Sequence, residues 1–230
     1  MKYSLLALFL VSGFLSCQNA DVAKRKEKSR DNVYYDYQIW GEEDSPEATI
    51  KLQYKTEDEE GQGMALEAPA NVYLDKTPFH LDSSKFSGSY YELTKPISEL
   101  EGEHAIVFVD KEGKERKETF SFQPFALAAE LPETLSRKPF VLALKNFSNT
   151  DAAVRLVLTD TSLESAGVNE EVDVVNGKIT VDSAMLSHLT SGPVTLELTR
   201  EEKQPLKNGH GAGGRLLMTY GLRRQFQLAD

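Results

Sequence analysis

Four histidines are the side chains best suited to metal binding or acid–base catalysis, but their spacing opposes both uses. His80, His104, His188 and His210 lie far apart in the chain, and none belongs to a His-x-x-x-His or His–Cys pattern. Zinc sites usually draw ligands from such short spacings. We therefore expect histidines that are exposed or hydrogen-bonded, and no metal site.

The segment 209–214 (GHGAGG) matches the G-x-G-x-x-G pattern of dinucleotide-binding loops. That chemistry needs a helix N-terminus after the loop, because the helix meets the pyrophosphate. Here an alternating, strand-like segment follows, so we expect a hairpin loop in which Asn208-Gly209 makes the turn. No G-x-S-x-G serine elbow is present either. The sequence thus predicts no cofactor, no catalytic residues and no enzymatic activity.

Acidic residues gather at 57–60 (EDEE) and at 42–44 (EED). Carboxylate oxygens are the ligands that Ca²⁺ prefers, but an EF-hand loop also needs a D-x-[DN]-x-[DN]-G pattern, which is missing. We expect these runs to be solvated acidic loops.

Aromatic residues are concentrated in the first half of the chain. Trp40, Tyr90 and Tyr91 are the candidates for ligand binding, because exposed rings stack on sugars or on protein partners. The other explanation is packing, since β-strands are naturally rich in these residues.

The only cysteine, Cys17, stands behind a short apolar segment. Residues 4–15 are almost entirely apolar, follow Lys2, and are too few to span a bilayer. Together with Ser16-Cys17 they resemble a bacterial lipoprotein signal peptide, although Phe14 stands where that family usually has Leu. The resemblance covers about the first 20 residues and implies cleavage before Cys17 and lipidation of its thiol.

A lipidated Cys17 would place the protein in the cell envelope. Residues 17–31 are charged and lack apolar periodicity, so they predict a solvated tether. Residue 18 is Gln rather than Asp, so an inner-membrane retention signal is absent and the outer membrane is favoured. Asp182-Ser183-Ala184 resembles the short acceptor motif for O-glycosylation in Bacteroidota, while Asp182 also suits a helix N-cap.

Charge excludes one class of partner. Removing residues 1–16 takes away Lys2, so the formal net charge falls from −10 to −11 (−10 − 1). Nucleic-acid binding depends on clustered Lys and Arg, so it is not expected. With a single cysteine no intramolecular disulfide can form, and the fold must rest on its apolar core.

Period-two alternation is the strongest pattern and indicates half-buried strands. It is clearest at residues 50–54, 120–122, 140–144, 154–158, 194–198 and 216–228, while Ala105–Val109 is apolar throughout and predicts a strand buried on both faces. Helical pattern is confined to residues 183–189. The predicted fold class is all-β, with two tandem immunoglobulin-like antiparallel β-sandwich domains.

A weak internal repeat sets the predicted boundaries. Residues 72–83 resemble 174–183, each a hairpin that ends in Asp-Ser, and prolines cluster between 124 and 139. The predicted organisation is a signal peptide at 1–16, a lipidated tether at 17–31, and sandwiches at 32–124 and 125–230.

These observations favour a lipid-anchored, non-enzymatic module that binds an envelope protein through a sheet edge or a loop surface. Two alternatives stay open. One is a carbohydrate-binding lipoprotein that uses the aromatic residues of the first domain. The other is a hydrolase whose site assembles only in three dimensions.

Overall fold

The computed structural model describes residues 32–147, 154–207 and 212–230, and strands dominate them. The predicted signal peptide, Cys17, the predicted tether and the predicted Asn208-Gly209 turn lie outside the described residues. The strands are β1 (Val33–Glu42), β2 (Glu47–Thr56), β3 (Gly63–Met64), β4 (Asn71–Leu74), β5 (Thr77–Pro78), β6 (His80–Ser84), β7 (Gly88–Pro96), β8 (Gly102–Val109), β9 (Glu115–Phe122), β10 (Ala126–Leu127), β11 (Thr134–Ser136), β12 (Phe140–Lys145), β13 (Val154–Asp160), β14 (Val168–Val172), β15 (Lys178–Val181), β16 (Gly192–Pro205) and β17 (Gly214–Ala229). The helices are α1 (Ile97–Leu100) and α2 (Ser183–Ser187).

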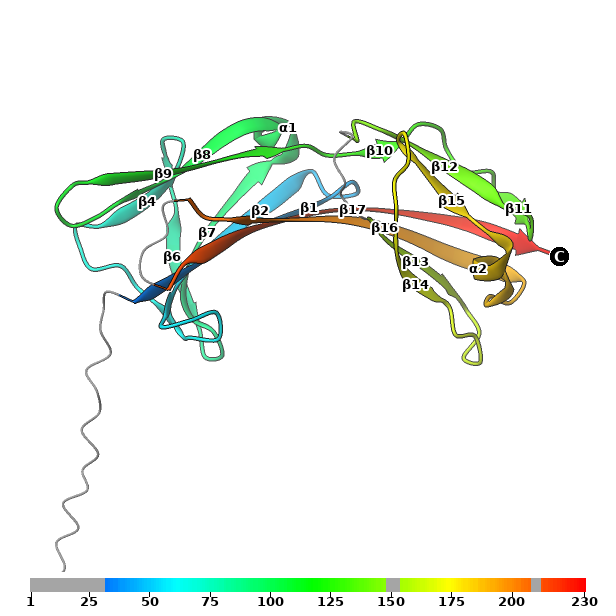
Figure 1. Cartoon of the computed structure of the whole chain (residues 1–230), viewed down its shortest axis with the longest axis horizontal. Coiled ribbons are helices and arrows are strands. Elements are labelled where there is room, and N and C mark those ends of the chain that lie inside the picture. Colours follow the sequence, from blue (N-terminus) through cyan, green and yellow to red (C-terminus); the bar gives the residue numbers. More distant parts are fainter. Residues whose placement is uncertain (1–31, 148–153, 208–211) are drawn as a thin grey trace, which may run out of the picture.

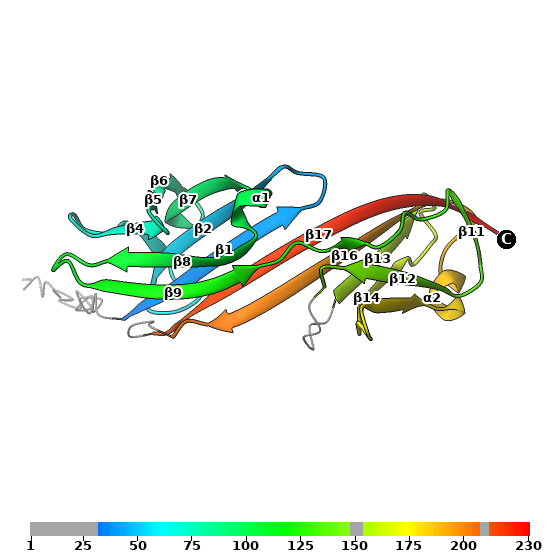
Figure 2. The same ribbon diagram turned by 90° about the horizontal axis from the view of Figure 1, so that it is seen from above.

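One large sheet runs the length of the molecule. Its ten strands follow the order β14-β13-β16-β17-β1-β2-β3-β7-β6, with β11 added beside β17. Two smaller sheets, β5-β4-β8-β9 and β10-β12-β15, lie next to each other over one side of it (Figures 1 and 2). The predicted all-β class is confirmed. The large sheet forms one layer, and the two smaller sheets, arranged in tandem, form the layer that faces it (Figure 1).

Strand β17 joins the two halves. It pairs antiparallel with β16 and parallel with β1, where Tyr35 lies opposite Gly214 and Glu42 opposite Gly221. Most other pairings are antiparallel, as predicted; β11–β17 and β3–β7 are also parallel. The large sheet therefore passes from the predicted range 32–124 into 125–230, while each smaller sheet stays within one range.

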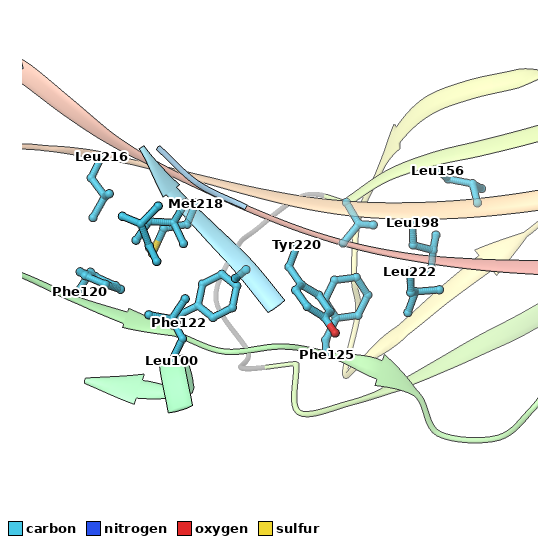
Figure 3. Packing of buried hydrophobic residues seen from close by; sticks show 14 of the residues in the cluster. Leu100, Phe120, Phe122, Phe125, Leu156, Leu198, Leu216, Met218, Tyr220 and Leu222 are labelled. Atoms are coloured by element: carbon cyan, nitrogen blue, oxygen red, sulfur yellow. The ribbon is translucent and has the colours of Figure 1, made fainter. Parts of the chain in front are cut away.

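The core lies between the large sheet and the smaller ones. Alternation turns every second residue of β1, β2 and β17 toward it, and Tyr37, Leu52 and Leu216 are at most 1% exposed. The rings of Phe122 and Tyr220 meet edge-on, with centroids 6.0 Å apart. Figure 3 shows the two layers facing each other, with Leu216, Met218, Tyr220 and Leu222 from β17 and Phe120, Phe122 and Phe125 from β9 and the residues after it.

A buried arginine fixes the segment that joins the smaller sheets. Arg200 of β16 is 5% exposed and donates a hydrogen bond to the carbonyl of Gln123 at 2.5 Å. Its guanidinium lies 5.8 Å from the ring of Phe125 and 5.6 Å from that of Phe147. Burial lowers the pKa of Arg200. The start of the proline-rich segment 124–139, the predicted joint between the domains, is therefore packed against the large sheet.

The structure bears on two local predictions, the helix cap at Asp182 and the burial of Ala105–Val109. Asp182 caps α2 by accepting a hydrogen bond from the backbone N–H of Met185 at 2.9 Å, which confirms the predicted N-cap. The prediction that Ala105–Val109 is buried on both faces is wrong. Val107 and Val109 are only half-buried, because none of the described sheets covers that face of the β5-β4-β8-β9 sheet.

Candidate functional site

The three predicted aromatic residues do not form one surface. Trp40 is 39% exposed on the uncovered face of the large sheet. Tyr91 faces the core, and its hydroxyl accepts a hydrogen bond from the backbone N–H of Leu66 at 2.9 Å. Tyr90 is turned to the opposite face because neighbouring residues of a strand alternate.

Tyr90 is also engaged by its neighbours. Its hydroxyl donates to the carboxylate of Asp82 at 3.2 Å, and the Nζ of Lys51 lies 4.2 Å from its ring centroid. Trp40 pairs with Thr49, which pairs with Thr94. Tyr90 thus lies two strands across the sheet and four residues along the strand from Trp40. The usual spacing between strands and the rise per residue put the two residues roughly 16 Å apart. A continuous stacking platform for a sugar is therefore not formed by these two rings.

One histidine forms a pair with a carboxylate. The Nδ1 of His104 lies 2.9 Å from Asp75, which also accepts the backbone N–H of Ala105 at 3.0 Å. The Nε2 of His104 is buried and has no hydrogen-bond partner. A general base must reach its substrate through a free nitrogen. The pair therefore supports a structural role, in which it ties the β4–β5 turn to β8.

The other catalytic or metal-binding candidates stay dispersed. His80 lies on β6, His188 ends α2, and His210 is outside the described residues. In the described part of the chain no group of three His, Cys, Asp or Glu residues is arranged to hold a metal ion. No helix among the described residues is long and apolar enough to cross a membrane.

A charged cluster lies on the uncovered face near the start of β1. The Asp36 side chain is fully buried there and accepts hydrogen bonds from the Nζ of Lys55 at 2.6 Å and from the Nε of Arg215 at 2.9 Å. Arg215 also pairs with Glu59, so the acidic run at 57–60 is not simply solvated. Burial acts to raise the pKa of Asp36, but the hydrogen bonds and charges of Lys55 and Arg215 together hold it below its ordinary value.

The β5-β4-β8-β9 sheet and the part of the large sheet that faces it enclose a cavity of about 560 Å³ at their open end. We call this cavity the mouth pocket. The large sheet contributes Val33, Tyr35, Tyr54 and Met64 to its walls, and the opposite sheet contributes Phe108 and Arg116. The loop at 65–70 and the β8–β9 turn at 110–112 form its rim. Concave apolar sites of this size, with a few polar groups, are typical of small-molecule binding.

The deep part of the mouth pocket is aromatic. The ring of Tyr54 lies 5.1 Å from that of Tyr35 and 5.5 Å from that of Phe108. The Tyr54 hydroxyl is paired with that of Tyr37 at 3.2 Å. Burial raises the pKa of Tyr35 more than the nearby Arg116 lowers it, so this hydroxyl stays protonated at neutral pH. The floor is therefore uncharged, and its hydroxyls are already partnered.

Charged groups stand at one side of the mouth pocket. The Nη1 of Arg116 donates to the Tyr35 hydroxyl at 3.2 Å, and its Nη2 lies 3.5 Å from Asp110. At the rim, Lys111 and Glu67 form an ion pair at 3.4 Å in which both side chains are about half exposed. Sequence reasoning missed this pocket, because its walls come from five separate segments; the aromatic enrichment of the first half was the one available signal.

The two edges of the large sheet differ in chemistry. At one edge every residue of β6 is exposed, and Leu81 and the neighbouring hairpin residue Phe86 are 54% and 92% exposed. At the other edge β14 exposes Asn169, Glu170 and Glu171. Charged residues discourage a further strand from pairing with an edge, whereas exposed apolar residues favour it.

No family model and no curated protein matches this chain. Among solved structures it is similar to the crystal structure of DIP-gamma IG1+IG2, at 8% identity over 83% of this chain and 98% of that one, with a TM-score of 0.24. A titin structure, Titin-A168169, matches at 9% identity over 86% and 99% of the two chains, with a TM-score of 0.24. The Yersinia pseudotuberculosis adhesin InvE matches at 13% identity over 84% and 61%, with a TM-score of 0.22. At such low TM-scores none of these likenesses defines the function of this chain.

Proposed function

We propose that this chain is an envelope-anchored, non-enzymatic interaction module that binds an extended segment of a partner protein along β6. The observation that carries the proposal is the contrast between the two edges of the large sheet. β6 is the last strand of the sheet, so no further described strand pairs with its outer side, and it exposes Leu81, with Phe86 in the hairpin that follows. β14 instead carries two adjacent carboxylates. An added strand gains main-chain hydrogen bonds from such an edge and specificity from its side chains.

The absence of an assembled reaction centre among the described residues supports a binding role. His104 keeps its free nitrogen buried, and the mouth pocket contains no histidine or serine. Acyl transfer and hydrolysis need a nucleophile, a base and a charge-stabilising group held close together. The carbohydrate alternative rests on Trp40, whose ring has no second exposed aromatic residue in the adjoining strands.

Site-specific photo-crosslinking in intact cells tests the β6 edge. A benzoylphenylalanine in place of Phe86 is expected to give a discrete adduct with one envelope protein. Leu81→Lys should reduce that adduct about tenfold, because it places a charge on the pairing edge. The matched controls are the same crosslinker at Leu163, which is also almost fully exposed, in the β13–β14 loop, and Glu170→Lys on the other edge. Equal adducts from residues 86 and 163, or an adduct that Leu81→Lys leaves unchanged, would exclude β6 as the interface.

The anchor is a separate part of the proposal. Cys17→Ser is expected to abolish incorporation of labelled fatty acid and to leave a precursor that is longer by the signal peptide, because acylation at this thiol precedes cleavage in the lipoprotein class. Metabolic labelling followed by electrophoresis measures both effects. Ser16→Thr serves as a control that keeps the thiol. Equal labelling of the wild type and the Cys17→Ser chain would show that this cysteine is not the anchor.

A further inference from the structure

We infer that the mouth pocket is a binding site for a long-chain carboxylate, with the acyl chain between the two sheets and the carboxylate at Arg116. This site is separate from the β6 edge. It is built from β1, β2, β3, β8, β9 and the loop at 65–70.

The interior of the pocket matches an acyl chain. Tyr35, Tyr54 and Phe108 form its floor, and Met64 and Leu66 extend the apolar wall toward the rim. The volume of about 560 Å³ is larger than a single inserted side chain requires. A sugar would bring many hydroxyl groups against walls whose own hydroxyls, those of Tyr35 and Tyr54, are already paired. Burying unpaired polar groups is costly, so an apolar body is favoured.

Arg116 supplies the counterpart for an anionic head. A guanidinium has five N–H donors, and the contacts to Tyr35 and Asp110 use two of them. The Asp110 contact is long, at 3.5 Å, and that carboxylate also accepts the backbone N–H groups of Glu112 and Lys114. The fork of donors that remains suits a planar carboxylate. Lys111 offers a second cation, because its exposed pair with Glu67 is of the weak surface type.

The position of the pocket in the chain points to a membrane-derived ligand. Val33, the first residue of β1, lines it. Val33 lies only 16 positions after Cys17 (33 − 17), and the chain between them spans at most about 55 Å when fully extended. With Cys17 anchored as proposed above, the mouth pocket stays close to the bilayer in which long-chain carboxylates partition.

Displacement of a fluorescent fatty acid tests the site. The whole mature polypeptide, residues 17–230 with Cys17→Ser, is titrated with cis-parinaric acid, whose fluorescence rises in an apolar site. Decanoate is expected to displace the probe at a concentration about tenfold lower than decanol, because only the carboxylate pairs with Arg116. Arg116→Met should bring the two competitors within about threefold of each other, while Arg116→Lys should keep part of the preference.

Two further variants show where the probe binds. Ala70→Trp fills the pocket and should remove saturable binding, whereas Ala184→Trp adds the same side chain on α2, far along the chain, and should leave binding unchanged. Circular dichroism checks that each variant is folded. Saturable binding that survives Ala70→Trp in a folded chain, or an absence of saturable binding in the wild type, would overturn the site. Equal potency of decanoate and decanol in the wild type, or stronger displacement by a lysophosphatidic acid with the same ten-carbon chain, would overturn the carboxylate as its ligand.

Discussion

Residues 32–124 produced without the rest of the chain are expected to remain largely unfolded. In the whole chain β1 pairs with β17 over eight residues, and β17 places Leu216, Met218 and Tyr220 in the core of the first half. Burial of a side chain such as Leu or Met contributes about 1.5–3 kcal/mol. Losing three such side chains removes several kcal/mol, which is comparable with the whole stability of an ordinary domain, about 5–15 kcal/mol.

Urea unfolding followed by circular dichroism measures this effect against residues 17–230 with Cys17→Ser. A synthetic peptide of residues 212–222, added to the fragment, should restore β-sheet signal because it supplies the strand that pairs with β1. The same peptide with Leu216→Asp and Met218→Asp is the matched control and should not restore it. A fragment that unfolds cooperatively at the same urea concentration as the whole chain would instead establish 32–124 as an independent domain.

Local patterns predicted the strands but not their partners. Alternation at 50–54, 120–122, 194–198 and 216–228 corresponds to β2, β9, β16 and β17, because a half-buried strand needs only neighbouring residues to show its two faces. The parallel pairing of β1 with β17 leaves no such trace. It joins residues that are about 180 positions apart, and no turn fixes its register.

The internal repeat also shows that local sequence does not determine which sheet a strand joins. Both copies contain a hairpin and are followed by a short helix, a glycine with positive φ at Gly102 or Gly192, and a long strand. Yet β8 belongs to a smaller sheet, while β16 belongs to the large one. Similar local residues thus build strands in different layers. The mouth pocket and the Asp36 cluster were hidden for the same reason, since Asp36 and Arg215 lie far apart in sequence.

A single substitution in the Asp36 cluster should have a large effect on stability. Asp36→Asn keeps the shape of the side chain and removes its charge, which leaves Lys55 and Arg215 without their shared partner. Breaking a buried ion pair from one side costs about 3–5 kcal/mol, and the partial exposure of the two cations places our expectation near the lower end of that range. Urea unfolding at pH 7 gives the difference. Glu197→Ala is the matched control, because its ion pair with Arg223 lies at the surface and should contribute less than about 1 kcal/mol.

The difference between the wild type and Asp36→Asn should also depend on pH. The pKa of Asp36 is lower in the folded chain than the ordinary value of 3.8, so its charge stabilises the fold above that value and the contribution is lost as the pH falls through the folded-state pKa. The gap in unfolding free energy should therefore be constant between pH 6 and 8, narrow below about pH 4, and become small in stronger acid. Unfolding curves of both proteins at each pH provide the test, and their difference cancels the titration of distant carboxyl groups such as Asp160 and Asp230. A gap that stays constant into acid would mean that Asp36 contributes through shape or hydrogen bonding alone and not through its charge.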